Sequence, residues 1–145
     1  PGINLSHREW AQPMYRRYFA PIVLAKCAGT TPKERTIRLL ELGLGCGMHN
    51  GPGGGVAFWR ALVLPPLTLE MHVFEYDIQC AQWWTNTHAN LATVHAGNQA
   101  NTEQLIMAVR RSGNRPFDFV IDDASHMSAH QYNSITTLFR FVRVG

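Results

Sequence analysis

The chain has 145 residues, enough for one domain, and its 46% hydrophobic and 16% charged residues are typical of a folded protein rather than a disordered one. A net charge of +3 without a dense Lys/Arg cluster argues against a nucleic-acid partner. No run approaches the roughly 18 apolar residues of a membrane span. The chain begins with Pro1 rather than Met, which is compatible with an upstream targeting segment.

The cysteine content favours free thiols. Cys27, Cys46 and Cys80 are an odd number and form no C-x-x-C pair. This pattern favours a reducing compartment over a disulfide framework. We therefore expect three free thiols and a cytoplasmic location.

Residues 1–35 predict a helical lead-in. Apolar and aromatic side chains recur at near-helical spacing between Trp10 and Ile22, and Pro13 and Pro21 mark helix starts or kinks. We expect one or two short helices that pack on one face of a sheet. A loop at 29–33 then separates this lead-in from the main domain, residues 36–145.

From residue 36 onward, short apolar runs alternate with helical patterns. We expect strands at 36–42, 70–76, 93–96 and 117–121. Helices are expected at about 56–62, 78–90, 101–111 and 129–141, with Asp77 as one N-cap and Asn101 or Thr102 as another. Strands that alternate with helices predict an α/β fold with a parallel sheet and right-handed crossovers.

A glycine-rich loop follows the first strand. Glycine occupies positions 43, 45, 47, 51, 53, 54 and 55. Glycine permits positive φ and lets the backbone approach a ligand closely. The loop is not a phosphate-binding P-loop, because no lysine lies between Arg35 and Gly55, and a dinucleotide fingerprint would need its third glycine where this chain has Met48.

Polar residues follow all four expected strands. In parallel sheets, ligands bind outside the carboxyl ends of the strands. We therefore expect one site built from the four segments Gly43–Gly47, Glu75 with Asp77, Asn98 with Gln99, and 122–126 (Asp-Asp-Ala-Ser-His).

Glu41-x-Gly43-x-Gly45-x-Gly47 resembles the first motif of Rossmann-like, class I S-adenosylmethionine-dependent methyltransferases. From Glu41 to Gly145 the chain is similar to one group of them, which includes macrolide-sugar O-methyltransferases and cephalosporin-hydroxylase-like proteins. The segments that carry this resemblance are 40–47, 74–77, Gly97-Asn98-Gln99, and Asp-Asp-Ala-Ser-His at 122–126. The long loop at 46–53 resembles a fungal subgroup.

The resemblance implies S-adenosylmethionine as cofactor. The backbone of Gly43, Gly45 and Gly47 would hold its methionine part, and Glu41 would help to orient it. Because its ligand carries no phosphate, the loop needs no lysine.

Three further strand-end residues are expected around the nucleoside. Glu75 would accept hydrogen bonds from the ribose hydroxyls. Asn98 and Gln99 would lie beside the adenine, where Asn98 replaces the usual aspartate and its amide oxygen can still accept. Asp122 would orient its loop by hydrogen bonding.

The same resemblance assigns the chemistry to Asp123 and His126. Asp123 would bind a divalent metal, for which hard oxygen ligands favour Mg²⁺ over zinc. His126 would act as general base for a hydroxyl of a sugar or other secondary metabolite, a small-molecule acceptor. Plain alternatives are helix capping for Asp123 and a structural histidine at position 126.

Methyltransferases of this fold have seven strands in the order 3-2-1-4-5-7-6, whereas this chain supplies four, in the expected order 3-2-1-4. We therefore expect a fragment, or a degenerate member, with an exposed apolar fourth strand that favours pairing with another chain, such as a homo-oligomer.

Three other functions stay open. The chain could be a non-catalytic cofactor-binding module. An NAD-dependent oxidoreductase is disfavoured by Met48 and by the 34 residues that separate Glu41 from Glu75 (75 − 41). An iron-dependent hydroxylase would need His130 as a third ligand beside Asp123 and His126.

Overall fold

The computed structural model describes residues 13 and 15–143 and contains one parallel sheet. Its strands are β1 (Thr36–Leu42), β2 (Thr68–Glu75), β3 (Thr93–Ala96) and β4 (Phe119–Asp122). They lie in the order β3-β2-β1-β4, which confirms the order predicted from the sequence. Within this sheet β1 is central: Glu41 is in register with Val73 of β2 and with Ile121 of β4.

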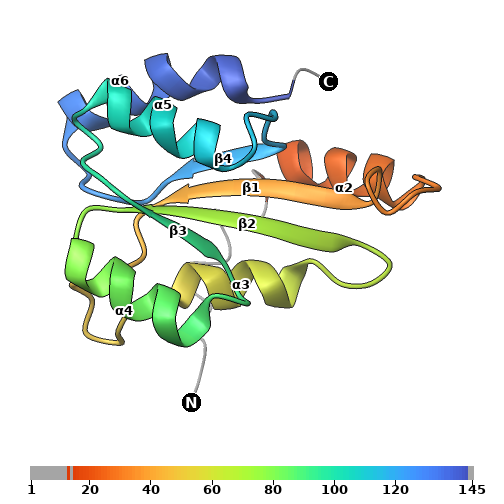
Figure 1. Ribbon diagram of the computed structural model, residues 1–145. Coiled ribbons are helices and arrows are strands. Elements are labelled where there is room, and N and C mark those ends of the chain that lie inside the picture. Colours follow the sequence, from red (N-terminus) through yellow and green to blue (C-terminus); the bar gives the residue numbers. More distant parts are fainter. Residues whose placement is uncertain (1–12, 14, 144–145) are drawn as a thin grey trace.

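Helices cover both faces of the sheet (Figure 1). α3 (Gly54–Leu62) and α4 (Ile78–His88) lie on one face, and α5 (Thr102–Arg111) and α6 (Ser128–Leu138) on the other. A π-helical turn, η2 (Tyr15–Phe19), and α2 (Ala20–Cys27) form the described part of the lead-in, and a 3₁₀ turn, η3 (Phe139–Phe141), follows α6. Trp10, the first residue of the predicted lead-in pattern, lies outside the described residues.

Alternating side chains of β1 build two cores. Leu39 packs in a cluster that includes Trp59 of α3, Trp84 of α4 and Phe19 of the lead-in. Leu40 packs on the opposite face in a second cluster, with side chains from α5 and α6. This alternation is the period-2 pattern of a strand buried on both faces, and it explains why apolar side chains occur at both odd and even positions of β1.

Helix caps fix the exits from the strands. The Asp77 side chain accepts a hydrogen bond from the backbone N–H of Cys80, and Asn101 accepts one from Gln104, so the predicted N-caps are confirmed. Capping residues of this type satisfy N–H groups that have no partner inside the helix. The two helices therefore begin directly after the polar segments that follow β2 and β3.

The fourth strand begins two residues later than predicted. Phe117 forms only an isolated bridge with Val142. The buried Asp118 carboxylate accepts a hydrogen bond from the N–H of Arg38 and forms ion pairs with Lys26 and Arg143. These polar contacts occupy the segment before the regular ladder starts. The predicted last helix, 129–141, likewise ends at Leu138 and continues only as the 3₁₀ turn.

The outer edge of β4 has no partner strand among the described residues. Beside it lies a pocket of about 600 Å³ lined by Val120 and by apolar side chains of α6 and η3. Tyr132, Ile135 and Phe139 are mostly exposed there. Among the described residues β4 is thus an unpaired edge, as predicted, but it is half-buried along its length rather than exposed. Within the described part of the chain, no helix is long and apolar enough to cross a membrane.

Candidate cofactor-binding site

The loops after β1 and β4 meet where the strand order reverses. The Gly43 N–H donates to the carbonyl of Phe74 at the end of β2 (2.8 Å), and the Asp123 N–H donates to the carbonyl of Leu42 (3.0 Å). Gly43 has φ +101°, and a Cβ there would lie 2.5 Å from the backbone oxygen of Asp123. Only glycine fits this position, which is the switch point where α/β sheets bind ligands.

Glu41 lies beneath the glycine loop rather than at its surface. The residue is 6% exposed, and its carboxylate lies so close to Gly55 of α3 that no Cβ fits between them. Burial, reinforced by the charge of Asp123, raises the pKa of Glu41 to about 7, although a hydrogen bond with the Trp59 side chain opposes the shift. Glu41 is thus placed to hold or release a proton near neutral pH.

Glu75 connects the ends of β1 and β2. Its Oε2 accepts a hydrogen bond from the backbone N–H of Leu44, and its Oε1 accepts one from that of Asp77, both at 2.8 Å. A carboxylate has about four acceptor positions, so two remain for a ligand. This arrangement fixes the Glu75 carboxylate between the glycine loop and the start of α4.

Gln99 forms the corresponding link on the other side. Its side-chain amide donates to Oδ2 of Asp122 (2.5 Å) and to Oγ of Ser134 (2.8 Å). The residue is 5% exposed. Gln99 therefore connects the loop after β3 to β4 and α6. The Asp122 carboxylate accepts one of these hydrogen bonds. Contact of Gln99 with adenine stays a prediction.

Asn98 shapes the same loop. Its Oδ1 accepts a hydrogen bond from the N–H of Ala100 at 2.8 Å, and its own N–H donates to Oε1 of Gln104 at 2.6 Å. The first contact is a local side-chain turn. One acceptor position of Oδ1 remains, so the predicted adenine contact is compatible with this geometry.

The segment after β4 exposes Asp123 and His126. Nε2 of His126 lies 3.7 Å from Oδ1 of Asp123, and both side chains are about 70% exposed. His126 has φ +56°, an uncommon conformation for a non-glycine residue, and this orients it in the loop before α6. Nearby, Oγ of Ser125 and Nδ1 of His130 are 2.9 Å apart. His130 is thus engaged with Ser125.

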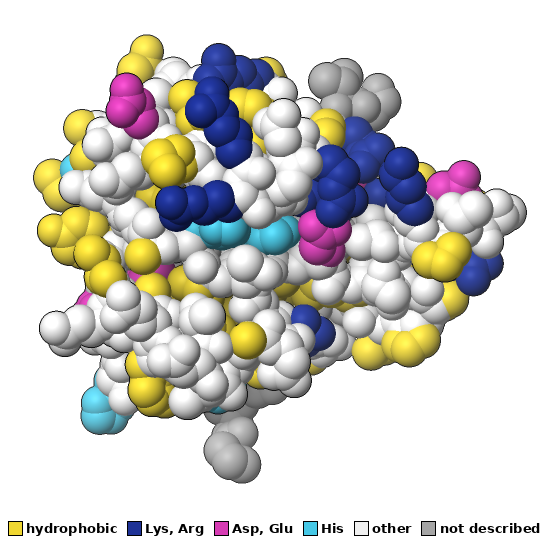
Figure 2. All heavy atoms as spheres, viewed as in Figure 1, with side chains coloured by type: hydrophobic (Ala, Val, Ile, Leu, Met, Phe, Trp, Pro, Cys, Tyr) yellow, Lys and Arg dark blue, Asp and Glu magenta, His cyan; other side chains and the backbone are white. Residues whose placement is uncertain are grey.

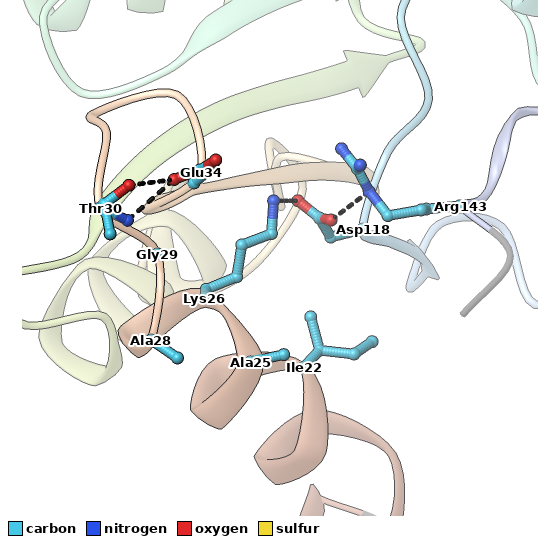
Figure 3. Close-up of a pocket in the computed structure, with 9 residues that line it drawn as sticks. All are labelled: Ile22, Ala25, Lys26, Ala28, Gly29, Thr30, Glu34, Asp118 and Arg143. Atoms are coloured by element: carbon cyan, nitrogen blue, oxygen red, sulfur yellow. Dashed lines mark hydrogen bonds and ion pairs between the residues drawn. The ribbon is translucent and has the colours of Figure 1, made fainter.

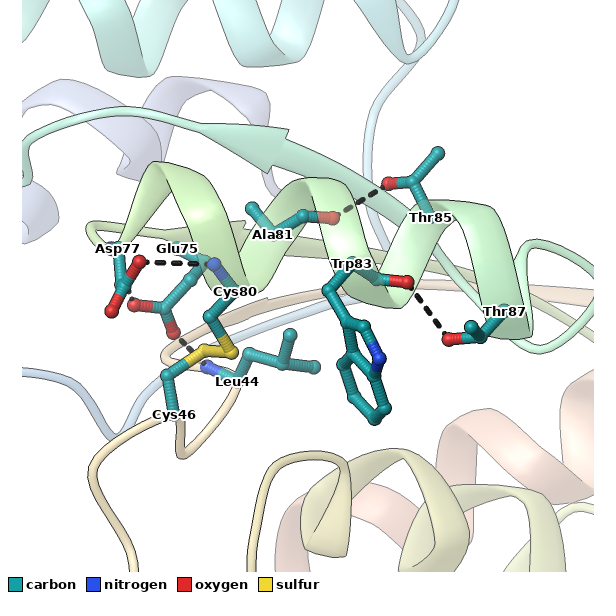
Figure 4. The surroundings of a disulfide bond; sticks show 9 residues. All are labelled: Leu44, Cys46, Glu75, Asp77, Cys80, Ala81, Trp83, Thr85 and Thr87. Carbon is teal, nitrogen blue, oxygen red and sulfur yellow. Dashed lines mark hydrogen bonds between the residues drawn. A yellow bond between two sulfur atoms is a disulfide. The ribbon is translucent and has the colours of Figure 1, made fainter.

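A disulfide bond joins Cys46 of the glycine loop to Cys80 of α4 (Figure 4). The prediction of three free thiols is therefore wrong; only Cys27 is free, and it is exposed. An odd cysteine count leaves one thiol over but does not prevent the other two from pairing. Here the fold brings the loop after β1 against the start of α4. The cysteine count consequently gives no argument for a reducing compartment.

Several residues of the site were not identified from the sequence. Asn133 and Ser134 of α6 bind the backbone and the side chain of Gln99, but no local pattern links segments that are 34 and 35 residues apart. Tyr76 and Ile78 are 72% and 58% exposed directly after Glu75. The sequence signal for this surface is an aromatic residue directly after a strand-end carboxylate, because bases stack on aromatic rings.

A separate pocket of about 580 Å³ lies between α2 and the start of β4, away from the carboxyl ends of the strands (Figure 3). Within it, the fully buried Asp118 carboxylate contacts Lys26 at 3.2 Å and Arg143 at 2.8 Å. Because both of its oxygens already accept from donors of this chain, we interpret the cluster as structural.

A second polar cluster lies on β2 and β3. Figure 2 shows histidine side chains bordered by basic and acidic side chains on one face of the molecule. Nδ1 of His72 is 3.2 Å from Nε2 of His95, and Nε2 of His72 is 3.2 Å from Oε1 of Glu70. Burial lowers the pKa of His72. Burial also lowers the pKa of His95, to about 4, and the nearby charges of His72 and Arg111 contribute to this shift.

Glu70 provides the negative charge of this cluster. Partial burial alone would raise the pKa of Glu70, but hydrogen bonds from His72, Arg38 and Arg115 together lower it. Arg115 reaches both carboxylate oxygens, at 2.7 and 2.8 Å. Among the described residues, no group of three or more His, Cys, Asp or Glu side chains could hold a metal ion, here or at Asp123.

Comparison with known proteins points to methyltransferases. The chain is 31% identical over 140 residues to mycinamicin VI 2''-O-methyltransferase of Micromonospora griseorubida. It is 30% identical, over the same length, to 8-demethyl-8-(2-methoxy-alpha-L-rhamnosyl)-tetracenomycin-C 3'-O-methyltransferase of Streptomyces olivaceus and to demethylmacrocin O-methyltransferase of Streptomyces fradiae. The chain is thus similar in sequence to these O-methyltransferases. No protein-family model matches it.

The fold comparison agrees. The MycE methyltransferase in complex with Mg, S-adenosylhomocysteine (SAH) and mycinamycin VI superposes with a TM-score of 0.68 at 27% identity. A second MycE structure, with Mg and SAH, gives 0.66 at 28% identity. These alignments cover 99% of this chain and 32% of MycE, and the sequence matches cover 94% of this chain and 30% of each relative. The chain thus spans about 30% of the length of the curated relatives it matches.

Proposed function

We propose that this chain is the cofactor-binding part of an S-adenosylmethionine-dependent O-methyltransferase that acts on a hydroxyl of a small molecule, a sugar or other secondary metabolite. The observation that carries the proposal is the Glu75 carboxylate, held by the N–H groups of Leu44 and Asp77 beside the glycine loop. The similarity to sugar O-methyltransferases and to SAH-bound MycE supports it.

The described residues fit the cofactor. Glu75 keeps two acceptor positions for the vicinal ribose hydroxyls, and Tyr76 and Ile78 offer exposed apolar surface next to it for the base. Gly43 lets the loop backbone approach the ligand. Glu41, buried beneath the glycine loop and against Gly55, would help to orient the methionine part through that loop. When bound, S-adenosylmethionine supplies an electrophilic methyl group.

Asp123 and His126 are proposed for the acceptor side. The exposed imidazole of His126 is free to take the proton of the acceptor hydroxyl as the oxygen becomes nucleophilic. Oδ1 of Asp123 lies 3.7 Å from Nε2 of His126, on the same exposed segment. Holding the acceptor beside the cofactor methyl converts a bimolecular step into an effectively unimolecular one.

A magnesium site is only partly provided by the described residues. Asp123 would contribute one carboxylate, a hard oxygen ligand suited to Mg²⁺. Because no group of three candidate ligands exists among these residues, they do not form a complete coordination set. We therefore propose Asp123 as a single metal ligand and route no step through a metal.

The proposal is tested by measuring SAH binding and methyl transfer to an acceptor. The chain is titrated with SAH in a calorimeter, and S-adenosylmethionine carrying a labelled methyl group is then supplied with a sugar-bearing acceptor, for which mycinamicin VI is a suitable first choice. Micromolar SAH binding supports the cofactor assignment, and label in the acceptor supports the full activity. Binding without transfer would favour a non-catalytic cofactor-binding module.

A further inference from the structure

A disulfide joins the glycine loop to α4, and Cys46 also packs against the core cluster around Leu39. In the described part of the chain, the hydrogen bonds of residues 45–52 stay inside the loop: Met48 N–H to Gly45 O, and Gly51 N–H to Met48 O. A Cβ at Gly47 or Gly51 would meet no atom within 4 Å, so the loop there lies in open space. The Cys46–Cys80 disulfide connects this stretch to the rest of the fold.

Cys80, the second cysteine of the disulfide, lies in a well-anchored part of the fold. Cys80 lies in the first turn of α4, and its N–H is held by the Asp77 side chain at 3.0 Å. Asp77 in turn donates its own N–H to Oε1 of Glu75. Figure 4 shows the disulfide beside the Glu75 carboxylate and Leu44. The bridge therefore crosses from the loop to α4 at the position where the ribose is proposed to bind.

We propose that the Cys46–Cys80 pair is a thiol–disulfide control of the cofactor site: the disulfide holds the loop in its binding conformation, and reduction lowers affinity for the cofactor. This inference rests on the proposed function. Glycine loses more backbone entropy on ordering than other residues, so a free glycine-rich loop pays a large cost when it closes on a ligand. A cross-link restricts the open ensemble and removes part of that cost.

The chemical step is thiol–disulfide exchange. A dithiol reductant attacks one sulfur of the bridge, forms a mixed disulfide, and then closes its own disulfide. Two electrons and two protons pass from the reductant to the chain, which gains the thiols of Cys46 and Cys80. Both cysteines are only partly buried, so a reductant can reach them.

The experiment compares SAH binding in the two redox states. The air-oxidised 145-residue chain and the chain reduced by a dithiol are titrated calorimetrically with SAH, after thiol counting confirms one and three free thiols respectively. We expect the reduced form to bind about three- to tenfold more weakly. Cys46→Ser should bind weakly in both conditions, whereas Cys27→Ser, which removes the exposed free thiol, should respond like the wild type.

Equal or tighter binding by the reduced chain overturns the proposal, and so do three free thiols that persist after treatment with oxidised glutathione. If neither form binds SAH, the proposed function fails, and hydrogen exchange decides the redox control separately. Faster exchange at residues 44–53 on reduction, with β1 and β2 unchanged, supports control of the loop. Unchanged exchange there overturns it.

Discussion

The backbone N–H of Leu44 donates a 2.8 Å hydrogen bond to Oε2 of Glu75 and thereby joins the glycine loop after β1 to the end of β2. Hydrogen bonds to ionised groups are stronger than neutral ones, and this one is buried. The same carboxylate is proposed to bind the ribose. Glu75 thus has two roles, in shaping the loop and in holding the ligand, and a substitution there tests both.

Replacing Glu75 by Gln should weaken SAH binding about 10- to 100-fold, because charge-assisted hydrogen bonds contribute about 1.5–3 kcal/mol. Calorimetric titration measures the change. Glu34→Gln is the matched control, since Glu34 is an exposed glutamate just before β1, at the opposite end of the sheet. Wild-type affinity in Glu75→Gln would contradict the ribose assignment.

His126→Ala should lower the rate of methyl transfer about 100- to 10,000-fold and leave SAH affinity almost unchanged, because a general base acts on the acceptor rather than on the cofactor. Single-turnover transfer from labelled S-adenosylmethionine gives the rate. His130→Ala is a suitable comparison, since Nδ1 of His130 is engaged with Ser125. If His126→Ala kept full turnover, the base would have to be another group.

Glu41 should make stability fall as pH rises. Its pKa is about 7 in the fold and 4.5 without the fold, so its contribution is fully present below pH 4.5 and is lost as pH approaches 7. The difference in free energy of unfolding between Glu41→Gln and the wild type should therefore shift by about 2–3 kcal/mol in favour of the variant when the pH is raised from 5 to 8. Urea denaturation at the two pH values measures this. Glu103→Gln, at an exposed site, should follow the wild type throughout.

His95 should have the opposite effect in the same range. Its pKa of about 4 in the fold lies below the ordinary 6.5, so its contribution is present above pH 6.5 and is lost as pH falls toward 4. The loss amounts to at most about 3 kcal/mol. Measuring it in the Glu41→Gln background removes the opposing group. There, His95→Gln should flatten the acid limb of the stability curve; a curve that stayed equally steep would show that another group titrates.

The sheet could be predicted because its signals are local. Each apolar run of four to eight residues ends at a glycine or polar cluster, and the glycine loop after β1 identifies the central strand. The start of β4 was misplaced because Phe117 and Asp118 look like strand residues in the sequence. The partners of the Asp118 carboxylate, which are Arg38, Lys26 and Arg143, come together only in the folded chain.

The candidate site residues could be placed at the strand ends from the sequence, but the contacts between them could not, and their roles toward the cofactor stay predictions. Gln99, after β3, and Asp122, at the end of β4, are joined by a hydrogen bond. The links through Ser134 and through the Cys46–Cys80 bridge join segments 34 or more residues apart, and no residue spacing encodes them. The cysteine count was misleading for the same reason, because pairing depends on proximity in the fold rather than on parity.

The most direct measurement is a calorimetric titration of the folded 145-residue chain with S-adenosylmethionine and SAH, with NADH as control. We expect micromolar binding of the first two ligands and no binding of NADH, with weaker binding of both ligands by Glu75→Gln. Binding of NADH alone, or no binding of either methionine-derived ligand by a chain whose circular dichroism shows the α/β fold, would contradict the assignment of the glycine loop and Glu75 to this cofactor.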